Sequence, residues 1–490
     1  MEKSNLIFNN KIEDKVYRKA IRNKKKYIKK YGDDSNIQYS LSSENIEYLE
    51  KYIPTKKIVI KNSNNSELNF KNEKPIIIGN IRMGFGHYRI SMAIASAAIA
   101  KGYTPYWFDL HSFNETTGGK VIANLNDLYS LGSRLSQKFS LFNKLYWEPL
   151  NSEGFKKLSY NAMDQKVAEL MTPVFGEIPK DIPFIATHVW PSQAAIHAGM
   201  KNVINVIPDN WPMALHLSEG AIHTVQTPSS FLGYKTLKNM DGKKILNSIP
   251  DSELVNVGHY IDHELVSNLE EDCSKRLDRI ENNKTKRLLL TVGGAGAQKE
   301  IYLSIIKKLM PSIKEKKVAL YINVGDHKSF FEDLIKEMPE LANEKDDLVY
   351  HYFDNYEKST EFAEKALNNE VSGIHIFYNK DIFGAVYLTN LLIRSCDLCI
   401  TKPSELAFYP VPKLMIKRVG GHEAYGAIRA SEIGDGTIEC ESTDKALQML
   451  DLILSSSEIL TMFNENILKA KEIGVYDGAY KVIELAVKDR

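Results

Sequence analysis

The sequence of 490 residues has only four cysteines and almost no net charge. Cys396 and Cys399 form a C-x-x-C, but no second ligand pair follows at the spacing of a zinc site. We therefore expect buried thiols in a reducing compartment and no metal. A net charge of +1 creates no overall field that would attract nucleic acid, so a basic contact surface would have to be local.

Long apolar runs are also missing. The longest nearly uninterrupted one, Ile90–Ala100, is shorter than the roughly 18 residues that a membrane-spanning helix needs. The first residues are charged and lack the apolar core of a signal peptide. We therefore expect a cytoplasmic protein, and any membrane contact would be peripheral.

Two common phosphate-binding motifs are absent. The pattern GxxxxGK[ST] does not occur, and neither glycine-rich loop continues as GxGxxG with an acidic residue at the usual spacing, so NAD is not expected. The chain has instead, at Pro75–Ala100, an apolar run, a glycine loop and a small-residue helix with His87 at its start. Such a unit brings backbone N–H groups to a helix N-terminus, where an anion or polar ligand can bind.

Residues 1–73 look like an N-terminal extension with a basic helix. Nine basic residues and no acidic one lie between Lys15 and Lys30. This helix is either a solvated surface or a contact with an anionic membrane, where each basic side chain contributes about 1 kcal/mol.

From Lys74 onward, short apolar runs alternate with helical stretches, and a second strand–glycine loop–helix unit begins near Lys284. This alternation predicts an α/β protein with two Rossmann-like, doubly wound domains that face a cleft at the carboxyl ends of their strands. The expected division is 1–73 extension, 74–283 acceptor domain, 284–477 donor domain and 478–490 C-terminal helix. The aromatic-rich segment Tyr129–Asp164 is either helical core or an acceptor-facing lid, and Phe353–Asn379 looks like an insertion.

Four segments, in order, resemble the GT-B glycosyltransferases, in particular the branch of plant and bacterial monogalactosyldiacylglycerol synthases. The peptidoglycan N-acetylglucosaminyltransferase belongs to the same superfamily. The segments are GFGHYRISMAIASA, IATHVWPSQAA, VIPDNWPMALHLSEGAIHTVQTPS and ITKPSELAFYPVPKLMIKRVGGHEAYGAIRASEIGDG. The resemblance covers roughly Lys74–Arg490. It implies a hexosyltransferase that moves a sugar from a nucleotide-sugar, in particular a UDP-sugar, to a hydroxyl acceptor. Transfer would invert the anomeric carbon, with no metal or other cofactor.

Three residues of these segments belong to the expected acceptor half. His87 titrates near neutrality and can hold the acceptor or move a proton, or it can merely cap its helix. Asp209 ends the apolar run VINVIP and suits a general base, or else an Asx turn. His188 ends IPFIAT in the same way and either orients Asp209 or the acceptor, or has a structural role.

The glycine loops and the donor half supply the expected substrate contacts. The glycines let the backbone approach a ligand, or they form ordinary tight turns. In TKPSELA a helix start would face the diphosphate, unless it is only a cap, and the turn RVGGHEAYGA would contact the donor sugar and ribose, unless it is a bare loop. The expected substrate-binding residues are Gly84, Gly86, Gly293, Gly294, Gly296, Thr401, Lys402, Ser404, Glu405, Gly421, His422, Glu423 and Tyr425.

Departures from the family pattern keep other functions open. Phe85 and Tyr88 stand where the family favours glycine and arginine, and Glu423 stands where glutamine is common. A catalytically silent nucleotide-sugar binding protein would keep the fold and lose the chemistry. A nucleotide-sugar epimerase would need acid and base residues in the donor half, for which the candidates are His375, His422 and Glu423. The partners expected are a nucleotide-sugar and, through Lys15–Lys30, an anionic membrane surface with a lipid acceptor.

Overall fold

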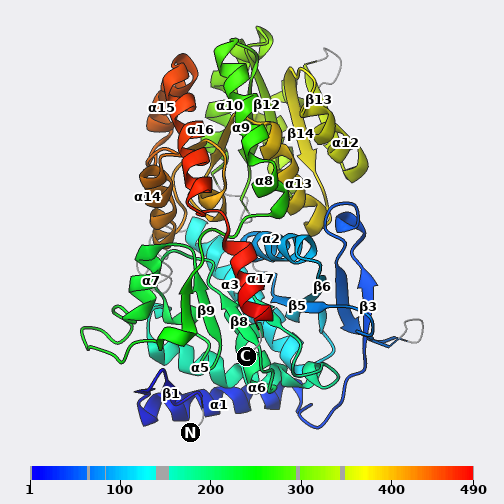
Figure 1. Cartoon of the computed structure of the whole chain (residues 1–490), viewed down its shortest axis with the longest axis vertical. Helices are drawn as coiled ribbons and strands as arrows, with labels where there is room; N and C mark the ends of the chain where they lie inside the picture. Colours follow the sequence, from blue (N-terminus) through cyan, green and yellow to red (C-terminus); the bar gives the residue numbers. More distant parts are fainter. Residues whose placement is uncertain are drawn as a thin grey trace.

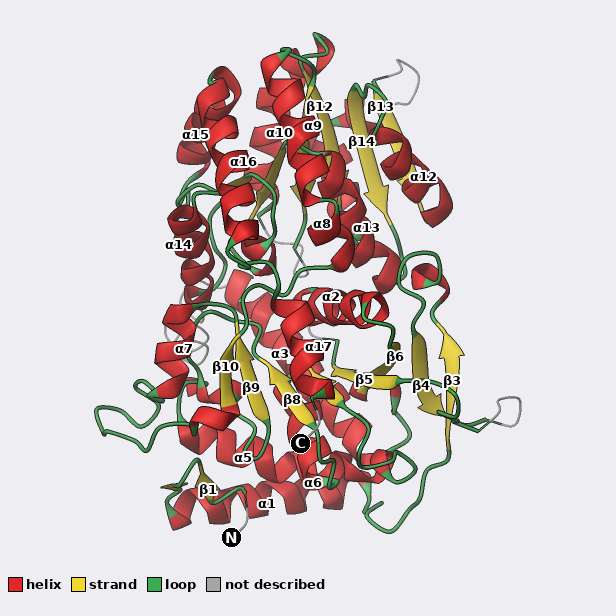
Figure 2. Cartoon of the chain, viewed as in Figure 1, coloured by secondary structure: helices red, strands yellow, loops and turns green. Residues whose placement is uncertain are grey.

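The computed structural model describes residues 3–62, 67–82, 84–138, 154–293, 298–342 and 348–488. Two α/β domains lie one above the other along the long axis of the molecule (Figure 1). Each domain is built on one mainly parallel sheet with helices packed around it (Figure 2). The predicted fold class is therefore confirmed.

The first sheet has eight strands in the order β10-β9-β8-β7-β5-β6-β4-β3, and all neighbours are parallel except β3 and β4. Its central strands are apolar and buried, as expected for a parallel sheet covered on both faces. The strands are β3 Leu41–Asn45, β4 Lys56–Ile60, β5 Pro75–Asn80, β6 Thr104–Asp109, β7 Phe184–Ala186, β8 Val203–Val206, β9 Ile222–Val225 and β10 Leu254–Asn256. A separate hairpin joins β1 Leu6–Ile7 and β2 Asn10–Lys11.

The second sheet has six strands, all parallel, in the order β13-β14-β12-β11-β15-β16. The strands are β11 Lys286–Thr291, β12 Val318–Asn323, β13 Val349–Phe353, β14 Gly373–Tyr378, β15 Leu398–Thr401 and β16 Lys413–Met415. Strand β13 is an edge strand, and sequence reasoning did not predict it.

The helices fall into two groups. Those that precede the second domain are α1 Asp14–Tyr31, α2 Gly86–Ala100, α3 Thr117–Lys138, α5 Leu158–Ala168, α6 Val189–His197 and α7 Pro228–Lys235. The remainder are α8 His263–Ser267, α9 Leu269–Glu281, α10 Lys299–Lys314, α11 Lys328–Glu337, α12 Tyr356–Ala366, α13 Ile382–Ser395, α14 Ala424–Ile433, α15 Thr443–Ser455, α16 Ser457–Glu472 and α17 Gly478–Val487. Among the described residues no single helix is long and apolar enough to cross a membrane, although α15 and α16, bent by 88°, pass that test of length and composition as a pair.

The N-terminal segment is not an extension, in contrast to the prediction. Strands β3 and β4 complete the first sheet, because the β-branched run KKIVI buries Ile58 beside β6. Helix α1 packs against α5, and Lys24 forms an ion pair with Glu169 at 2.6 Å. Of the segment Tyr129–Asp164, residues 139–153 lie outside the described part. Its C-terminal portion belongs to α5, whose buried residues support the reading as helical core.

The boundary predicted at residue 283 also differs from the structure. Helix α9 packs against α16 and so belongs to the second domain, which places the first crossing between domains near Val257–Asp262. The chain crosses back just before α17, which packs against α2 of the first domain. The two crossings are hydrogen-bonded to each other, from His259 N to Val475 O at 2.6 Å and from Gly478 N to His259 O at 3.0 Å.

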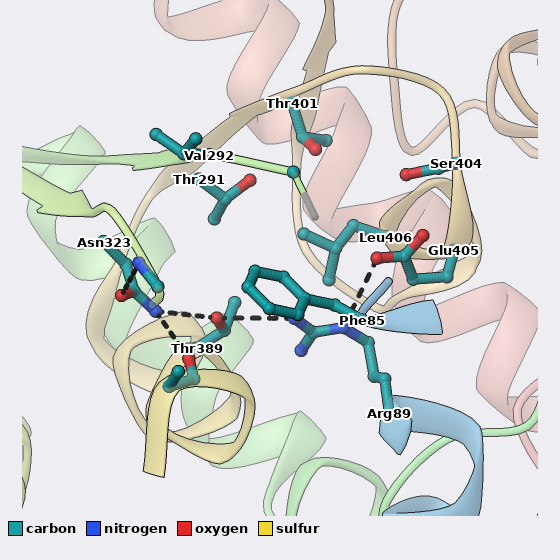
Figure 3. Close-up of a pocket in the computed structure, with 13 residues that line it drawn as sticks. Phe85, Arg89, Thr291, Val292, Asn323, Thr389, Thr401, Ser404, Glu405 and Leu406 are labelled. Atoms are coloured by element: carbon teal, nitrogen blue, oxygen red, sulfur yellow. Dashed lines mark hydrogen bonds and ion pairs between the residues drawn. The ribbon is translucent and has the colours of Figure 1, made fainter. Parts of the chain in front are cut away.

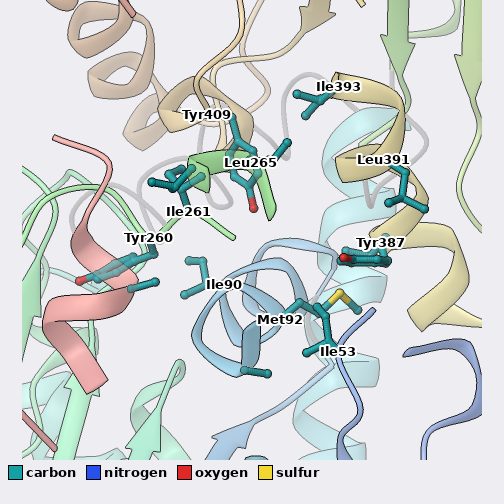
Figure 4. Close-up of a cluster of buried hydrophobic side chains, with 14 of the residues drawn as sticks. Ile53, Ile90, Met92, Tyr260, Ile261, Leu265, Tyr387, Leu391, Ile393 and Tyr409 are labelled. Carbon is teal, nitrogen blue, oxygen red and sulfur yellow. The ribbon is translucent and has the colours of Figure 1, made fainter. Parts of the chain in front are cut away.

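Helix α2 lies between the two domains. Every residue from Tyr88 to Ala98 is buried, as is typical of a helix at the centre of a protein, and most of these residues are small or apolar. One continuous cluster joins Ile90 and Met92 of α2 to Tyr260 at the first crossing, to Leu265 of α8 and to Tyr387 of α13 (Figure 4). The two domains therefore share one hydrophobic core.

The closeness of the two crossings generates a prediction. A methyl group at position 478 would lie 2.3 Å from the Gly258 oxygen and 2.5 Å from the His259 oxygen. We expect Gly478→Ala to destabilise the protein by about 2 kcal/mol, because backbone at both crossings would have to move. The control is Gly176→Ala, whose added methyl would meet its nearest atom at an ordinary 3.5 Å. Thermal unfolding measures both; equal melting temperatures would contradict the close packing of the crossings.

Candidate active site

The predicted site residues that the structure describes lie where the carboxyl ends of the two sheets face each other. From the first domain come the loop between β5 and α2, the end of β7 and the end of β8. From the second domain come the ends of β11, β12 and β15. In parallel α/β sheets the loops at these strand ends form the ligand sites, so this cleft is the candidate active site.

His87 is held in one tautomer at the start of α2. Its Nδ1 atom lies 2.6 Å from the carbonyl oxygen of Thr187, and because a carbonyl can only accept, Nδ1 carries the proton. Burial is the largest influence on the ring and lowers the pKa of His87, while the hydrogen bond to Thr187 and the carboxylates of Asp209 and Glu405 partly offset it. The ring is therefore neutral near pH 7, with the lone pair on Nε2.

His188 caps helix α6. Its Nδ1 atom accepts from Trp190 N at 3.1 Å, and its ring lies edge-on to the ring of His87 with centroids 4.8 Å apart. Burial lowers the pKa of His188 well below its usual value. The geometry supports the structural reading of His188, as a buried cap that also packs against His87.

Asp209 follows β8, as the sequence suggested, and its carboxylate contacts His216. Its Oδ2 atom lies 3.2 Å from Nε2 of His216, and Nδ1 of His216 lies 2.6 Å from the hydroxyl of Tyr234. The side chain of Asp209 is 37% exposed, whereas that of His216 is 8% exposed. His216 therefore orients the carboxylate at the cleft. Sequence reasoning missed His216, although it lies in the same family segment, seven residues after Asp209.

On the opposite side, Lys402 and Glu423 form a partly buried ion pair. Glu423 also accepts from the backbone N–H groups of Val419 at 2.7 Å and Gly420 at 3.3 Å. A methyl group at Gly293 would come within 2.8 Å of Cε of Lys402, so the lysine side chain lies across the glycine loop after β11. Glu423 thus holds Lys402 beside that loop and balances its charge.

The predicted helix after β15 is much shorter than expected. Glu405–Phe408 forms one 3₁₀ turn, and the Ser404 side chain makes no capping hydrogen bond. Thr401 Oγ1 donates to the Lys402 carbonyl at 3.2 Å. A single turn has too few aligned peptide groups to give a useful dipole, so this segment does not supply the helix N-terminus that the prediction required.

The turn at Gly421 leads through Glu423 into α14, as expected. The ring of Tyr425 contacts Trp211 of the first domain edge-on, with centroids 4.8 Å apart. Of the other predicted residues, Gly294, Gly296 and the side chain of His422 lie outside the described part of the chain.

The cleft is closed by residues of the first glycine loop (Figure 3). Arg89 is 2% exposed, donates to Asn390 Oδ1 at 3.0 Å and lies 3.8 Å from Glu405. The ring of Phe85 covers Gly325, where a methyl group would come within 2.7 Å of it. Gly84 has φ +70, a conformation that glycine adopts readily, and Gly86 faces the Glu405 carboxylate at 3.6 Å from its ideal Cβ position.

The remaining cavity is about 10 Å³, enough for roughly one water molecule. It lies between Phe85 and Arg89 on one side and Thr291, Thr401 and Ser404 on the other (Figure 3). The domains would have to separate locally before a larger ligand could enter. Within the described ranges no group of three or more His, Cys, Asp or Glu side chains could hold a metal ion, and all four cysteines are free and buried.

Comparisons with known proteins match two successive parts of the chain, and the second match includes β10 and α17 of the first domain. Residues 6–236 match the family model "Domain of unknown function (DUF6937)", and residues 249–487 match "Domain of unknown function (DUF6938)". The gap between the two matches lies just before the first crossing. No curated protein sequence matches the chain.

Several solved structures are similar to the chain at low sequence identity. They include UDP-GlcNAc 2-epimerase from Neisseria meningitidis bound to UDP-GlcNAc, with a TM-score of 0.46 and 12% identity over 85% of this chain and 100% of that chain. α,α-Trehalose 6-phosphate synthase from Burkholderia multivorans has a TM-score of 0.43 and 10% identity over 84% and 96%. The calicheamicin glycosyltransferase CalG4 has a TM-score of 0.41 and 11% identity over 85% and 98%. Similarity at this level does not determine an activity.

The histidine geometry can be tested directly. We expect NMR of histidine-labelled protein to show His87 protonated at Nδ1, with a pKa below 6.5, because burial disfavours the charged ring. The signal is assigned by its loss in His87→Gln. The exposed His263, which lies outside the cleft, is the internal control and is assigned in the same way. A proton on Nε2 of His87, or a pKa above 6.5, would contradict the geometry.

Proposed function

We propose that the protein is an inverting glycosyltransferase that uses a UDP-sugar and that His87 is its general base. The observation that carries this proposal is the fixed tautomer of His87, which leaves the Nε2 lone pair available where the two domains meet. A general base must be neutral before the reaction and within reach of the acceptor hydroxyl. His87 meets the first condition, and its place at the start of α2 in the cleft suits the second.

The reaction would proceed as a direct displacement. The acceptor hydroxyl gives its proton to Nε2 of His87 while its oxygen bonds to the anomeric carbon. The bond from that carbon to the diphosphate oxygen breaks, and the nucleoside diphosphate leaves with the electron pair. Asp209 and Glu405 both lie near enough to His87 to favour its charged form, so they would stabilise the imidazolium as it forms.

Positive charge for the departing diphosphate is available from both domains. Arg89 reaches into the pocket from α2, and Lys402 lies beside the glycine loop after β11. Both are held by carboxylates, Arg89 beside Glu405 and Lys402 by Glu423. We propose that an entering diphosphate competes with these carboxylates, which would couple binding to the opening of the cleft. We propose that these two basic side chains stabilise the diphosphate without a metal ion.

An epimerase receives less support from the side chains. His375, one of its candidate residues, lies in the amino-terminal half of β14 rather than at the carboxyl end. Its ring nitrogens lie 3.2 Å from the Tyr352 hydroxyl and 3.0 Å from the Ser372 carbonyl. Glu423 is engaged by Lys402. The first domain, in contrast, supplies His87 and Asp209 at the cleft, as acceptor activation requires.

The donor proposal predicts stabilisation by UDP. We expect UDP at 100 times its dissociation constant to stabilise the protein by about 2.7 kcal/mol, equally with and without EDTA. Differential scanning fluorimetry with UDP, GDP and TDP measures this. No shift with UDP, or a shift that EDTA abolishes, would contradict a metal-independent UDP site.

The base proposal predicts a separation of binding and turnover. We expect His87→Ala to lower UDP release from UDP-sugars about 10²- to 10⁴-fold in the presence of a cell extract as acceptor source, with the thermal shift by UDP unchanged. His263→Ala is the matched control, since this exposed histidine lies outside the cleft. Turnover by His87→Ala at the wild-type rate would exclude His87 as the base. UDP binding without any turnover in the wild type would indicate a silent binding protein, and a changed sugar without transfer would indicate an epimerase.

We further propose that α1 contacts an anionic membrane surface. Its apolar side chains and Lys24 face α5, while eight of its basic residues are exposed, namely Lys15, Arg18, Lys19, Arg22, Lys25, Lys26, Lys29 and Lys30. Because the apolar face is already covered, contact would be electrostatic and would weaken with salt. Helix α1 lies at the end of the first domain away from the second domain (Figure 1), so it would tether the protein rather than present a lipid acceptor to the cleft.

The membrane contact has a charge-matched test. We expect replacement of Lys15, Lys19 and Arg22 by glutamate to reduce binding to vesicles of phosphatidylserine and phosphatidylcholine at least tenfold in 0.1 M salt, since each basic residue contributes about 1 kcal/mol. The control variant replaces the exposed Lys238, Lys243 and Lys244 of the same domain by glutamate, which changes the net charge by the same amount. Cosedimentation measures both variants, and equal losses would show that net charge rather than α1 determines binding.

A further inference from the structure

A second cavity lies on the outer edge of the second domain, formed by residues of β13, β14 and α12. Its volume is about 430 Å³, within the range of small-molecule sites. Much of its wall comes from Phe353–Asn379, the segment that resembled an insertion in the sequence. It shares no lining residue with the pocket in the cleft. The lining residues are Tyr350, Tyr352, Lys358, Glu361, Phe362, Lys365, Ala366, Asn369, Glu370, Val371, Ser372 and His375.

One wall of this groove is made of aromatic rings in fixed positions. Tyr350 and His375 are register partners on neighbouring strands, and their rings stack at 4.9 Å with an angle of 9°. Phe362 of α12 lies against His375, with ring centroids 4.3 Å apart. The His375 ring is further held between the Ser372 carbonyl and the Tyr352 hydroxyl. Tyr350 is nevertheless 36% exposed and lines the groove.

The rim carries charges of both signs. Lys358 and Lys365 are exposed, as are Glu361 and Glu370, and Lys365 pairs with Glu361 at 2.6 Å. The four charges sum to zero, so the groove presents no net field to an anion or a cation. The carboxylates and the nearby Asn369 still offer acceptors and donors for neutral polar groups.

This combination matches a neutral sugar. A pyranose ring has an apolar C–H face that fits against an aromatic ring, and its hydroxyls at the edge can bond to carboxylates and amides. Glu361 and Glu370 would repel a phosphate, and the two lysines would repel a quaternary amine. We propose that the groove formed by β13, β14 and α12 is a glycan-binding site that takes a neutral oligosaccharide, with Tyr350 stacking on one sugar ring. This site is independent of the reaction proposed for the cleft.

The test uses the full-length protein and four neutral probes: maltohexaose, cellohexaose, laminarihexaose and chitohexaose. Isothermal titration calorimetry and saturation-transfer NMR measure their binding. We expect at least one of them to bind with a dissociation constant below about 1 mM, and Tyr350→Ala to weaken that binding at least tenfold. Tyr350→Trp, which keeps a stacking ring, should bind within threefold of the wild type.

The matched control is Phe353→Ala. Phe353 is on the same strand and is 37% exposed, but it does not line the groove, so its removal should leave glycan affinity unchanged. Excess UDP should not displace the glycan. Absence of binding by all four probes, unchanged affinity in Tyr350→Ala, or displacement by UDP would overturn the proposal. Each of these readouts is independent of transferase activity, so loss of the cleft proposal would leave the groove proposal intact.

Discussion

The structure depends on the burial of helix α2 between the two sheets. Its small and apolar side chains let β5 and β6, α17 and the second domain's α13 approach it from different sides. Because the helix is buried along most of its length, its first turn has a fixed position. His87 lies in that first turn, and Arg89 follows two residues later. The hydrophobic core shared by the domains therefore also determines where the candidate base and the buried guanidinium lie.

This arrangement has an electrostatic cost that points to ligand binding. Arg89 is almost fully buried, and its Nε atom has no hydrogen-bond partner within the described residues. A carboxylate oxygen of Glu405 lies 3.8 Å from this Nε atom, too far for a direct hydrogen bond. A buried cation without close compensation is costly. An anionic ligand between Arg89 and the ends of β11 and β15 would supply that compensation.

Much of the fold was predictable, because buried parallel strands are short apolar runs such as Ile76–Ile78 and Leu288–Leu290, each next to a turn signal. Strands β3 and β4 were missed although KKIVI has a clear β pattern, because the basic stretch before them suggested a separate segment. The boundary at residue 283 failed for a different reason. Whether α9 packs on the first or the second domain is decided by tertiary contacts with α16, and its amphipathic pattern is the same in either place.

In the candidate site, too, single residues could be predicted from the local sequence, whereas contacts between distant residues could not. His87 could be predicted because it begins the helix after the glycine loop, and Asp209 because it ends the apolar run that contains β8. The role of His216 could not, since only folding brings it to Asp209, and the pairing of Lys402 with Glu423 joins residues on separate loops. The short turn Glu405–Phe408 was predicted as a helix start because Ser404 is a good capping residue, yet Tyr409-Pro410 follows within one turn and limits its length.

The two ends of the second sheet differ in the ligands that they favour. Its carboxyl end joins the cleft, where Arg89 and Lys402 stand against carboxylates and a charged diphosphate can replace one of these partners. Toward its amino end, β13 and β14 present aromatic rings and balanced charges, which favour a neutral, partly apolar ligand. A charged group gains most from a buried, unbalanced site, whereas a neutral sugar gains most from ring stacking at an open one. Under the two proposals, the same domain would bind a nucleotide-sugar at one end and a glycan at the other without competition between them.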